Sequence, residues 1–184
     1  DNTTNGSAVR FDKTVPTLDN VTIASNNTLY TTMAKTGDNI TLSFTSSEAI
    51  QTPSVSISGQ AATVTGDNMT WSAAYTMTDN NTDNVSVSLN IDFEDLAGND
   101  GIAVTSTIGG SAVLFDRTKP ILGRVTEFTT PSADNRTWSA VYTMTSNDSE
   151  EPVSLNIDFE DLAGNPGSAV TSTIGGSAVL FDKT

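Results

Sequence analysis

The sequence contains neither cysteine nor histidine among its 184 residues, and only 8 of them are lysine or arginine. Without cysteine and histidine the chain cannot hold a Ser-His-Asp or Cys-His catalytic centre, a thiolate or imidazole zinc site, or a disulfide. With 22 aspartates and glutamates the net charge is -14, which repels phosphate backbones. We therefore expect no nucleic-acid partner and no enzymatic activity.

Long apolar runs are also missing, since no window approaches the 18 or so apolar residues that a membrane helix needs. We expect no membrane insertion. The chain begins at Asp1, without a methionine, a basic stretch or an apolar leader. This start predicts a processed chain or a part of a longer protein.

Serine and threonine are abundant, at 51 residues, and apolar residues alternate with polar ones. The clearest alternation is VSVSLNIDF at residues 85–93, which places five apolar side chains on one face of a strand. The same period of two appears in residues 39–44, 54–57 and 70–77. These patterns predict a chain built from β-strands.

Turn residues separate the expected strands at intervals of about ten residues. The pair Gly109-Gly110, between Val104 and Val113, predicts a two-residue hairpin. From Leu18 to Thr118 we count about seven strands, which is typical of an immunoglobulin-like β-sandwich. The predicted core residues are Leu18, Ile40, Leu42, Phe44, Val55, Ile57, Trp71, Tyr75, Leu89, Ile91 and Phe93.

The chain repeats itself. SLNIDFEDLAGN occurs at residues 88–99 and 154–165, and AVTSTIGGSAVLFD occurs at residues 103–116 and 169–182. A third fragment, GSAVRFDKT at residues 6–14, matches GSAVLFDRT at residues 110–118. We predict that the residues closing each repeat as a terminal strand, and taking part in assembly, are Val9, Phe11, Val113, Phe115, Val179 and Phe181.

The repeats differ in length, because the FDxT motifs are 104 residues apart in the first repeat and 66 in the second. This spacing predicts a terminal strand of a preceding module, or a donor strand, at residues 1–14, a complete module at 15–118, and a shortened module at 119–184. The shortened module lacks the counterpart of roughly Asn26 to Thr65, which holds several core strands. We expect it to be unstable alone and to expose Trp138, Tyr142, Leu155, Ile157 and Phe159.

These motifs resemble the tandem bacterial Ig-like repeats of very large secreted or surface-anchored proteins, commonly adhesins. The resemblance is carried by DLAGN before a Gly-containing turn, by the terminal SAVxFDxTxP strand, and by the opening TGDNITLSFTSSEAI. It implies an extracellular module without enzymatic activity that extends, spaces or assembles a surface structure.

Clustered carboxylates and amides suggest a calcium site, because calcium prefers six to eight oxygen ligands. The candidate ligands are Asp95, Asn99, Asp100 and Asp116. The alternative is that these side chains only cap turns and add solubility. The aspartates of the FDxT motifs, Asp12, Asp116 and Asp182, either belong to stiff proline-containing links or form an ion site between modules. Apart from this structural calcium, we expect no cofactor.

Two functions agree with these patterns. The first is a stiff spacer or stalk segment of a bacterial surface protein, whose partners are neighbouring modules and a cell-surface or matrix ligand. The second is a subunit of an extracellular filament, in which protomers exchange β-strands, because an open sheet edge pairs readily with another chain.

Overall fold

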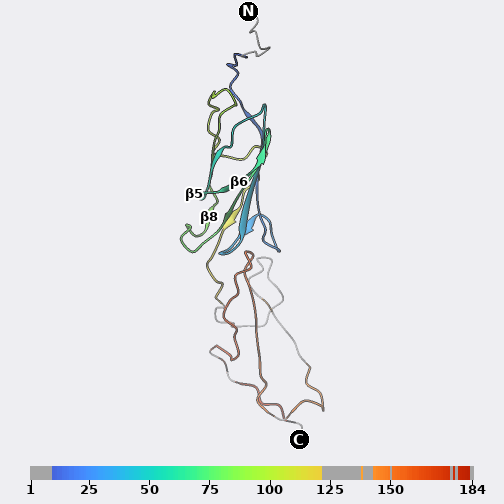
Figure 1. Cartoon of the computed structure of the whole chain (residues 1–184). Coiled ribbons are helices and arrows are strands. Elements are labelled where there is room, and N and C mark those ends of the chain that lie inside the picture. Colours follow the sequence, from blue (N-terminus) through green and yellow to red (C-terminus); the bar gives the residue numbers. More distant parts are fainter. Residues whose placement is uncertain are drawn as a thin grey trace, which may run out of the picture. The chain divides into compact units, whose positions relative to one another are not determined.

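The computed structural model describes residues 10–121, 138, 143–149, 151–174, 176 and 178–182 (Figure 1). These residues form an all-β structure without a helix, so none of them belongs to a helix long and apolar enough to cross a membrane. The chain divides into two compact units. The first consists of Asp1–Thr118 with Leu162–Asn165, and the second of Lys119–Asp161 with Pro166–Thr184.

An antiparallel four-stranded sheet forms one side of the first unit. Its order is β1-β3-β7-β6, with bounds Leu18–Ser25, Asn39–Ser46, Thr70–Thr76 and Thr63–Asp67. In β3 the side chains of Ile40, Leu42 and Phe44 are buried, and the residues between them are exposed or half-buried. The alternation predicted for this strand and for residues 70–77 is therefore confirmed.

Two smaller sheets complete the first unit. One has the order β2-β10-β8, with bounds Met33–Ala34, Leu114–Phe115 and Val85–Ser86. The other has the order β5-β4-β9, with bounds Gln60–Ala61, Ser54–Ile57 and Leu89–Asp92. Side chains from all three sheets meet in one buried cluster, so the fold resembles a β-sandwich.

Residues 85–93 do not form one strand, although their alternation is continuous. They divide into β8, which pairs with β10, and β9, which pairs with β4. The chain changes its pairing partner between Ser86 and Leu89, and Val85 at the start is 39% exposed. The period of two reports which side chains face inward, and it carries no information on the neighbouring strand.

The hairpin predicted at Gly109-Gly110 is wrong. Both glycines have positive φ, at 110° and 81°, but Val104 pairs with Ile91 instead of Val113. Ile108 bridges to Val21 of β1, and the chain then crosses to β10 in another sheet. The turn residues were recognised correctly, while the strands on either side belong to different sheets.

The predicted core is buried, with one exception. Tyr75 is half-buried, and its hydroxyl donates a hydrogen bond to Asn81 Oδ1 at 3.3 Å. Ten residues are buried as expected: Leu18, Ile40, Leu42, Phe44, Val55, Ile57, Trp71, Leu89, Ile91 and Phe93.

The equivalent strand-closing residues lie in different environments. Val113 and Phe115 are fully buried, whereas Phe11 is 85% exposed and Val179 is 66% exposed. Phe181 is half-buried, and Val9 lies outside the described residues. In the part of the chain that the structure describes, only the copy at residues 113–115 closes a packed core.

The second unit keeps some contacts of the first but exposes its apolar side chains. The backbones of Ile157 and Val170 exchange two N–H to O hydrogen bonds, both at 3.0 Å. Ile91 and Val104 exchange the same two bonds in the first unit, at 2.9 and 3.0 Å. Ile157 is nevertheless 40% exposed and Trp138 is 68% exposed, while their counterparts Ile91 and Trp71 are 0% and 6% exposed. Leu155 and Phe159 are half-buried, and Tyr142 lies outside the described residues.

We predict that Phe115→Ala lowers the free energy of unfolding of the first unit by about 3 to 5 kcal/mol, because it empties a fully buried site. Phe11→Ala is the matched control, since the same motif residue is exposed there and its loss should cost less than about 0.5 kcal/mol. Denaturant unfolding measures both. Equal effects of the two substitutions would contradict the strand register.

Candidate functional site

Three carboxylates meet in a pocket of about 520 Å³ in the first unit. Asp12 precedes β1, Glu48 follows β3, and Asp95 follows β9, and one carboxylate oxygen of each lies within 4.8 Å of those of the other two. Arg10 also lines the pocket, with its guanidinium 3.9 Å from the Asp12 carboxylate. Residues far apart in the sequence therefore meet at one site rich in oxygen ligands.

Asp95 is the buried member of this cluster, at 2% exposure. Its Oδ1 accepts hydrogen bonds from the backbone amides of Ala97 and Asn99, both at 2.8 Å, and its Oδ2 accepts one from the Asn99 side chain at 2.7 Å. The Asn99 side chain, together with backbone amides of the loop, holds the pKa of the Asp95 carboxyl below its usual range, although burial acts in the opposite direction. Asp95 is therefore ionised at neutral pH.

The loop around Asp95 is shaped by glycine as well as by hydrogen bonds. Gly98 has a φ of 86°, a conformation that other residues adopt at a cost. A Cβ on Gly101 would lie 2.2 Å from the Phe93 ring, so the loop can close over this ring only with glycine there. The string DLAGN, with a glycine two residues after it, thus supplies both the acceptor and the backbone freedom that the loop needs.

Glu48 supplies the observation that points to a cation. Its Oε1 atom is buried and has no hydrogen-bond partner in the described part of the chain. An unpaired buried carboxylate oxygen is costly, and a bound cation would satisfy it. Because the nearby ligands are all carboxylates, the cluster fits a hard cation such as calcium, which binds oxygen ligands in flexible geometry.

The structure brings together part of the predicted calcium site. Asp95 and Asn99 lie side by side, but the amide nitrogen of Asn99 donates to Asp95 and to the backbone oxygen of Asp12. Asp100 is exposed and pairs with Glu94 through the backbone. Asp116 follows β10 and is not part of the carboxylate cluster, and its backbone oxygen accepts from the Asn165 side chain at 2.9 Å.

The sequence indicated only one of the two residues that form the carboxylate cluster with Asp95. Asp12 was an expected candidate for an ion site, through its FDxT motif. Glu48 was missed, because it is 47 residues from Asp95 and no spacing links the two. Only the pairing of strands brings the end of β3 to this loop, where Gln51 also donates from its backbone to Glu94 at 2.9 Å.

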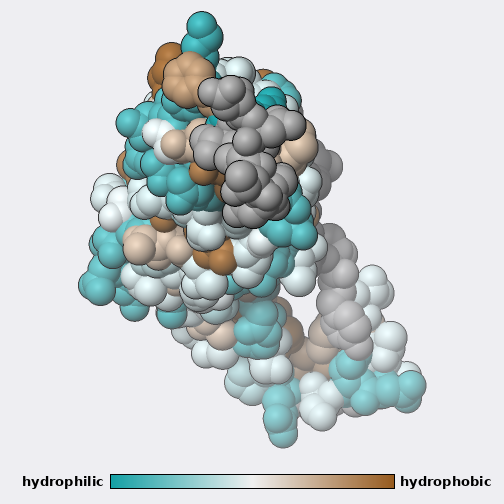
Figure 2. All heavy atoms as spheres, turned by 45° about the horizontal axis from the view of Figure 1, so that its top comes forward, coloured by the Kyte–Doolittle hydropathy of each residue, from teal (hydrophilic) through white to brown (hydrophobic). Residues whose placement is uncertain are grey.

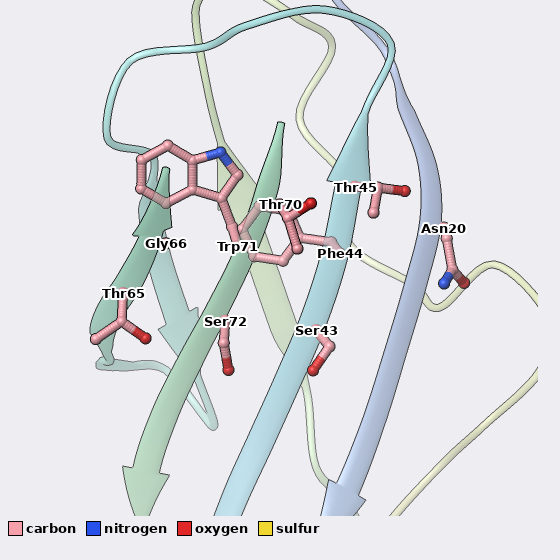
Figure 3. A pocket seen from close by; sticks show the side chains of 9 residues that line it. All are labelled: Asn20, Ser43, Phe44, Thr45, Thr65, Gly66, Thr70, Trp71 and Ser72. Atoms are coloured by element: carbon pink, nitrogen blue, oxygen red, sulfur yellow. The ribbon is translucent and has the colours of Figure 1, made fainter. Parts of the chain in front are cut away.

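A second pocket, of about 300 Å³, lies on the four-stranded sheet (Figure 3). Ser43, Thr65, Ser72 and other hydroxyl-bearing residues line it, together with Asn20, Phe44 and Trp71. Trp71 lies beside Gly66, where a Cβ would come within 3.1 Å of the indole. The lining has no carboxylate and no base, so it offers no group for acid-base chemistry.

Surface hydropathy adds little to the candidate sites. On the face shown in Figure 2, hydrophilic and neutral residues prevail, and the hydrophobic ones form small separate spots.

Comparison with protein-family models, with curated proteins and with solved structures finds no match to this chain. The carboxylate cluster is the strongest candidate site in the described residues, because it combines three carboxylates with a buried oxygen that has no hydrogen-bond partner there.

We predict that calcium stabilises the first unit through this cluster. A ligand at about 100 times its Kd adds about 2.7 kcal/mol, which raises the Tm of a domain of this size by roughly 10 °C or more. Thermal unfolding with calcium and with EDTA measures the shift. Glu48→Gln should remove most of the calcium-dependent shift in Tm. The control Asp100→Asn changes an exposed residue in the loop that contains Asp95, and it should keep the shift. Superimposable curves with and without calcium would contradict the site.

Proposed function

We propose that the chain is a segment of tandem Ig-like modules that acts as a stiff spacer in an extracellular bacterial surface protein, without enzymatic activity. One observation carries the proposal. Asn99 donates from its side chain to the backbone oxygen of Asp12 at 3.3 Å, and Asn165 donates in the same way to Asp116 at 2.9 Å. In both repeats an FDxT segment is thus bonded to the DLAGN loop that follows it.

The two DLAGN loops share one further hydrogen bond and one close approach, which supports a common structural role. The amide of Gly101 donates to Phe93 at 2.9 Å, and that of Gly167 donates to Phe159 at 2.8 Å. A Cβ on Gly167 would lie 2.3 Å from the Phe159 ring, which repeats the close approach at Gly101. This loop keeps its form in a repeat that lacks about 40 residues, so its role does not depend on the missing strands.

The segments that enter and leave the first module are both held to it, as a spacer requires. On the entering side Pro16 is fully buried, and the amide of Thr17 donates to the Ser47 hydroxyl at 3.0 Å. On the leaving side Asp83 accepts bonds from the amide of Arg117 at 2.7 Å and from the hydroxyl of Thr118 at 2.5 Å. The Arg117 amide, with the Thr118 hydroxyl, holds the pKa of Asp83 below its usual range.

Calcium would strengthen the entering side. Asp12 belongs to the entering segment, whereas Glu48 and Asp95 belong to the module. A divalent cation held by all three carboxylates would neutralise their mutual repulsion and tie the segment to the module. The second repeat has no counterpart of Glu48, which lies in the missing stretch, so we expect this site once in the chain.

A second candidate function, a filament subunit joined by strand donation, is favoured by the apolar surface of the second unit. Val179 and Leu180 are 66% and 67% exposed, whereas the equivalent residue Val113 is fully buried. Such a surface is a template for a strand from another chain. In this function the shortened repeat is completed by a neighbouring protomer.

Sedimentation velocity and electron microscopy of the native protein separate the two functions. We predict a monomer of 19.2 kDa at all accessible concentrations, because a spacer holds its neighbours within one chain. Fibres with a regular axial repeat would overturn the spacer function and support strand donation. The matched variant Leu180→Ser reduces the exposed apolar surface and should leave a monomer unchanged but weaken fibres.

A further inference from the structure

The chain contains the same tetrapeptide, Leu-Ala-Gly-Asn, twice, and the two copies differ in burial. We call Leu96–Asn99 the first LAGN loop and Leu162–Asn165 the second LAGN loop. In the second loop Ala163 is fully buried and Asn165 is 6% exposed. In the first loop Ala97 and Gly98 are exposed. Gly98 and Gly164 have similar φ values, at 86° and 79°, so burial differs while the backbone at this glycine is alike.

The second LAGN loop is part of the first compact unit, where it is buried against a group of residues around Asn27. The side chain of Asn27, itself 6% exposed, donates to the backbone oxygen of Ala163 at 2.7 Å and to Asp38 Oδ2 at 3.0 Å. Asp38 also accepts from the amide of Lys35 at 3.0 Å. We call Asn27, Lys35 and Asp38 the Asn27 site.

Every polar group of the Asn27 side chain has a hydrogen-bond partner only when a LAGN loop is docked there. Its Oδ1 accepts from the amides of Leu29 and Tyr30 at 3.0 and 3.2 Å, and one of its N–H groups is bonded to Asp38. The remaining N–H group has the Ala163 oxygen as its partner. A buried donor that loses its acceptor is costly, so the Asn27 site favours this backbone carbonyl. Residue 163 is also fully buried at this site, so a longer side chain there would have to displace its neighbours.

The numbers of loops and sites do not match. The Asn27 site lies within the stretch Asn26 to Thr65, which has no counterpart in the second repeat. The chain therefore has two LAGN loops and one Asn27 site, and the second loop occupies it. The first loop carries the same sequence and presents its alanine and glycine to solvent.

We propose that the first LAGN loop is a docking element for the Asn27 site of another copy of the complete repeat. The inference rests on the proposed function and names the partner of each module within it: the loop of one repeat fills the Asn27 site of the repeat before it. The partner must supply a buried asparagine amide for the alanine carbonyl. In the isolated chain the Asn27 site is filled from within, so two chains do not join.

Gly164→Pro tests this docking, because proline fixes φ near -65° and excludes the value of 79° found at Gly164. The second loop should leave the Asn27 site and open it to the first loop of another chain. Since a short connection within one chain corresponds to an effective concentration on the order of 1 mM, sedimentation is followed up to about 1 mM. We expect the average mass to rise with concentration above twice the 19.2 kDa of one chain.

Two double variants provide the matched controls. Gly164→Pro with Ala97→Gln should stay monomeric, because Ala97 is exposed in the folded loop but its counterpart Ala163 is fully buried when docked. Gly164→Pro with Asn27→Ala should also stay monomeric, because the amide donor is lost. Ala163→Gln opens the site without changing the backbone, and it replaces Gly164→Pro if that variant does not fold.

The inference is overturned if chains with an opened site remain at 19.2 kDa, or if they associate equally with and without Ala97→Gln. The second result would assign the association to the apolar surface of the second unit. Fibres formed by the unmodified chain would overturn the spacer function alone. The docking inference is still judged then by the difference that Ala97→Gln makes.

Discussion

The buried carboxylate of Asp95 holds together the loop through which the entering segment contacts the first module. Two backbone amides and one side-chain amide satisfy it, and all three belong to the four residues that follow it. These bonds fix the position of Asn99, which reaches the backbone of Asp12, and they present Ala97 and Gly98 to solvent. The entering segment, the carboxylate cluster and the exposed LAGN loop are therefore consequences of one local structure.

The second repeat shows which contacts of this loop remain in a repeat that lacks several strands of the sandwich. It retains the close approach of glycine to phenylalanine and the bond from asparagine to the preceding FDxT segment. It has lost the stretch that provides Glu48 and the Asn27 site, and its apolar side chains are exposed. The loop is thus a self-contained element, while calcium binding and docking require strands that only the complete repeat has.

The sequence predicted the features that depend on residues close together in the chain. Alternating apolar residues identified the β class and ten of eleven core residues, because inward and outward faces follow from a period of two. It did not predict that residues 85–93 divide between two sheets or that Gly109-Gly110 leads from one sheet to another, since pairing depends on strands distant in the chain. For the same reason Asp95 and Asn99, four residues apart, were both named as candidate calcium ligands, whereas Glu48 and Asn27 were not recognised as site residues.

The most direct test of this account is the pH dependence of unfolding in EDTA, compared between the unmodified chain and Asp95→Asn. Because the pKa of Asp95 is lowered in the folded state, its stabilisation is present above the unfolded value of about 4 and is lost as pH falls through the folded value. We predict that between pH 6 and pH 2 the unmodified chain loses clearly more stability than the variant. Equal losses would contradict the central role of the ionised Asp95 carboxylate.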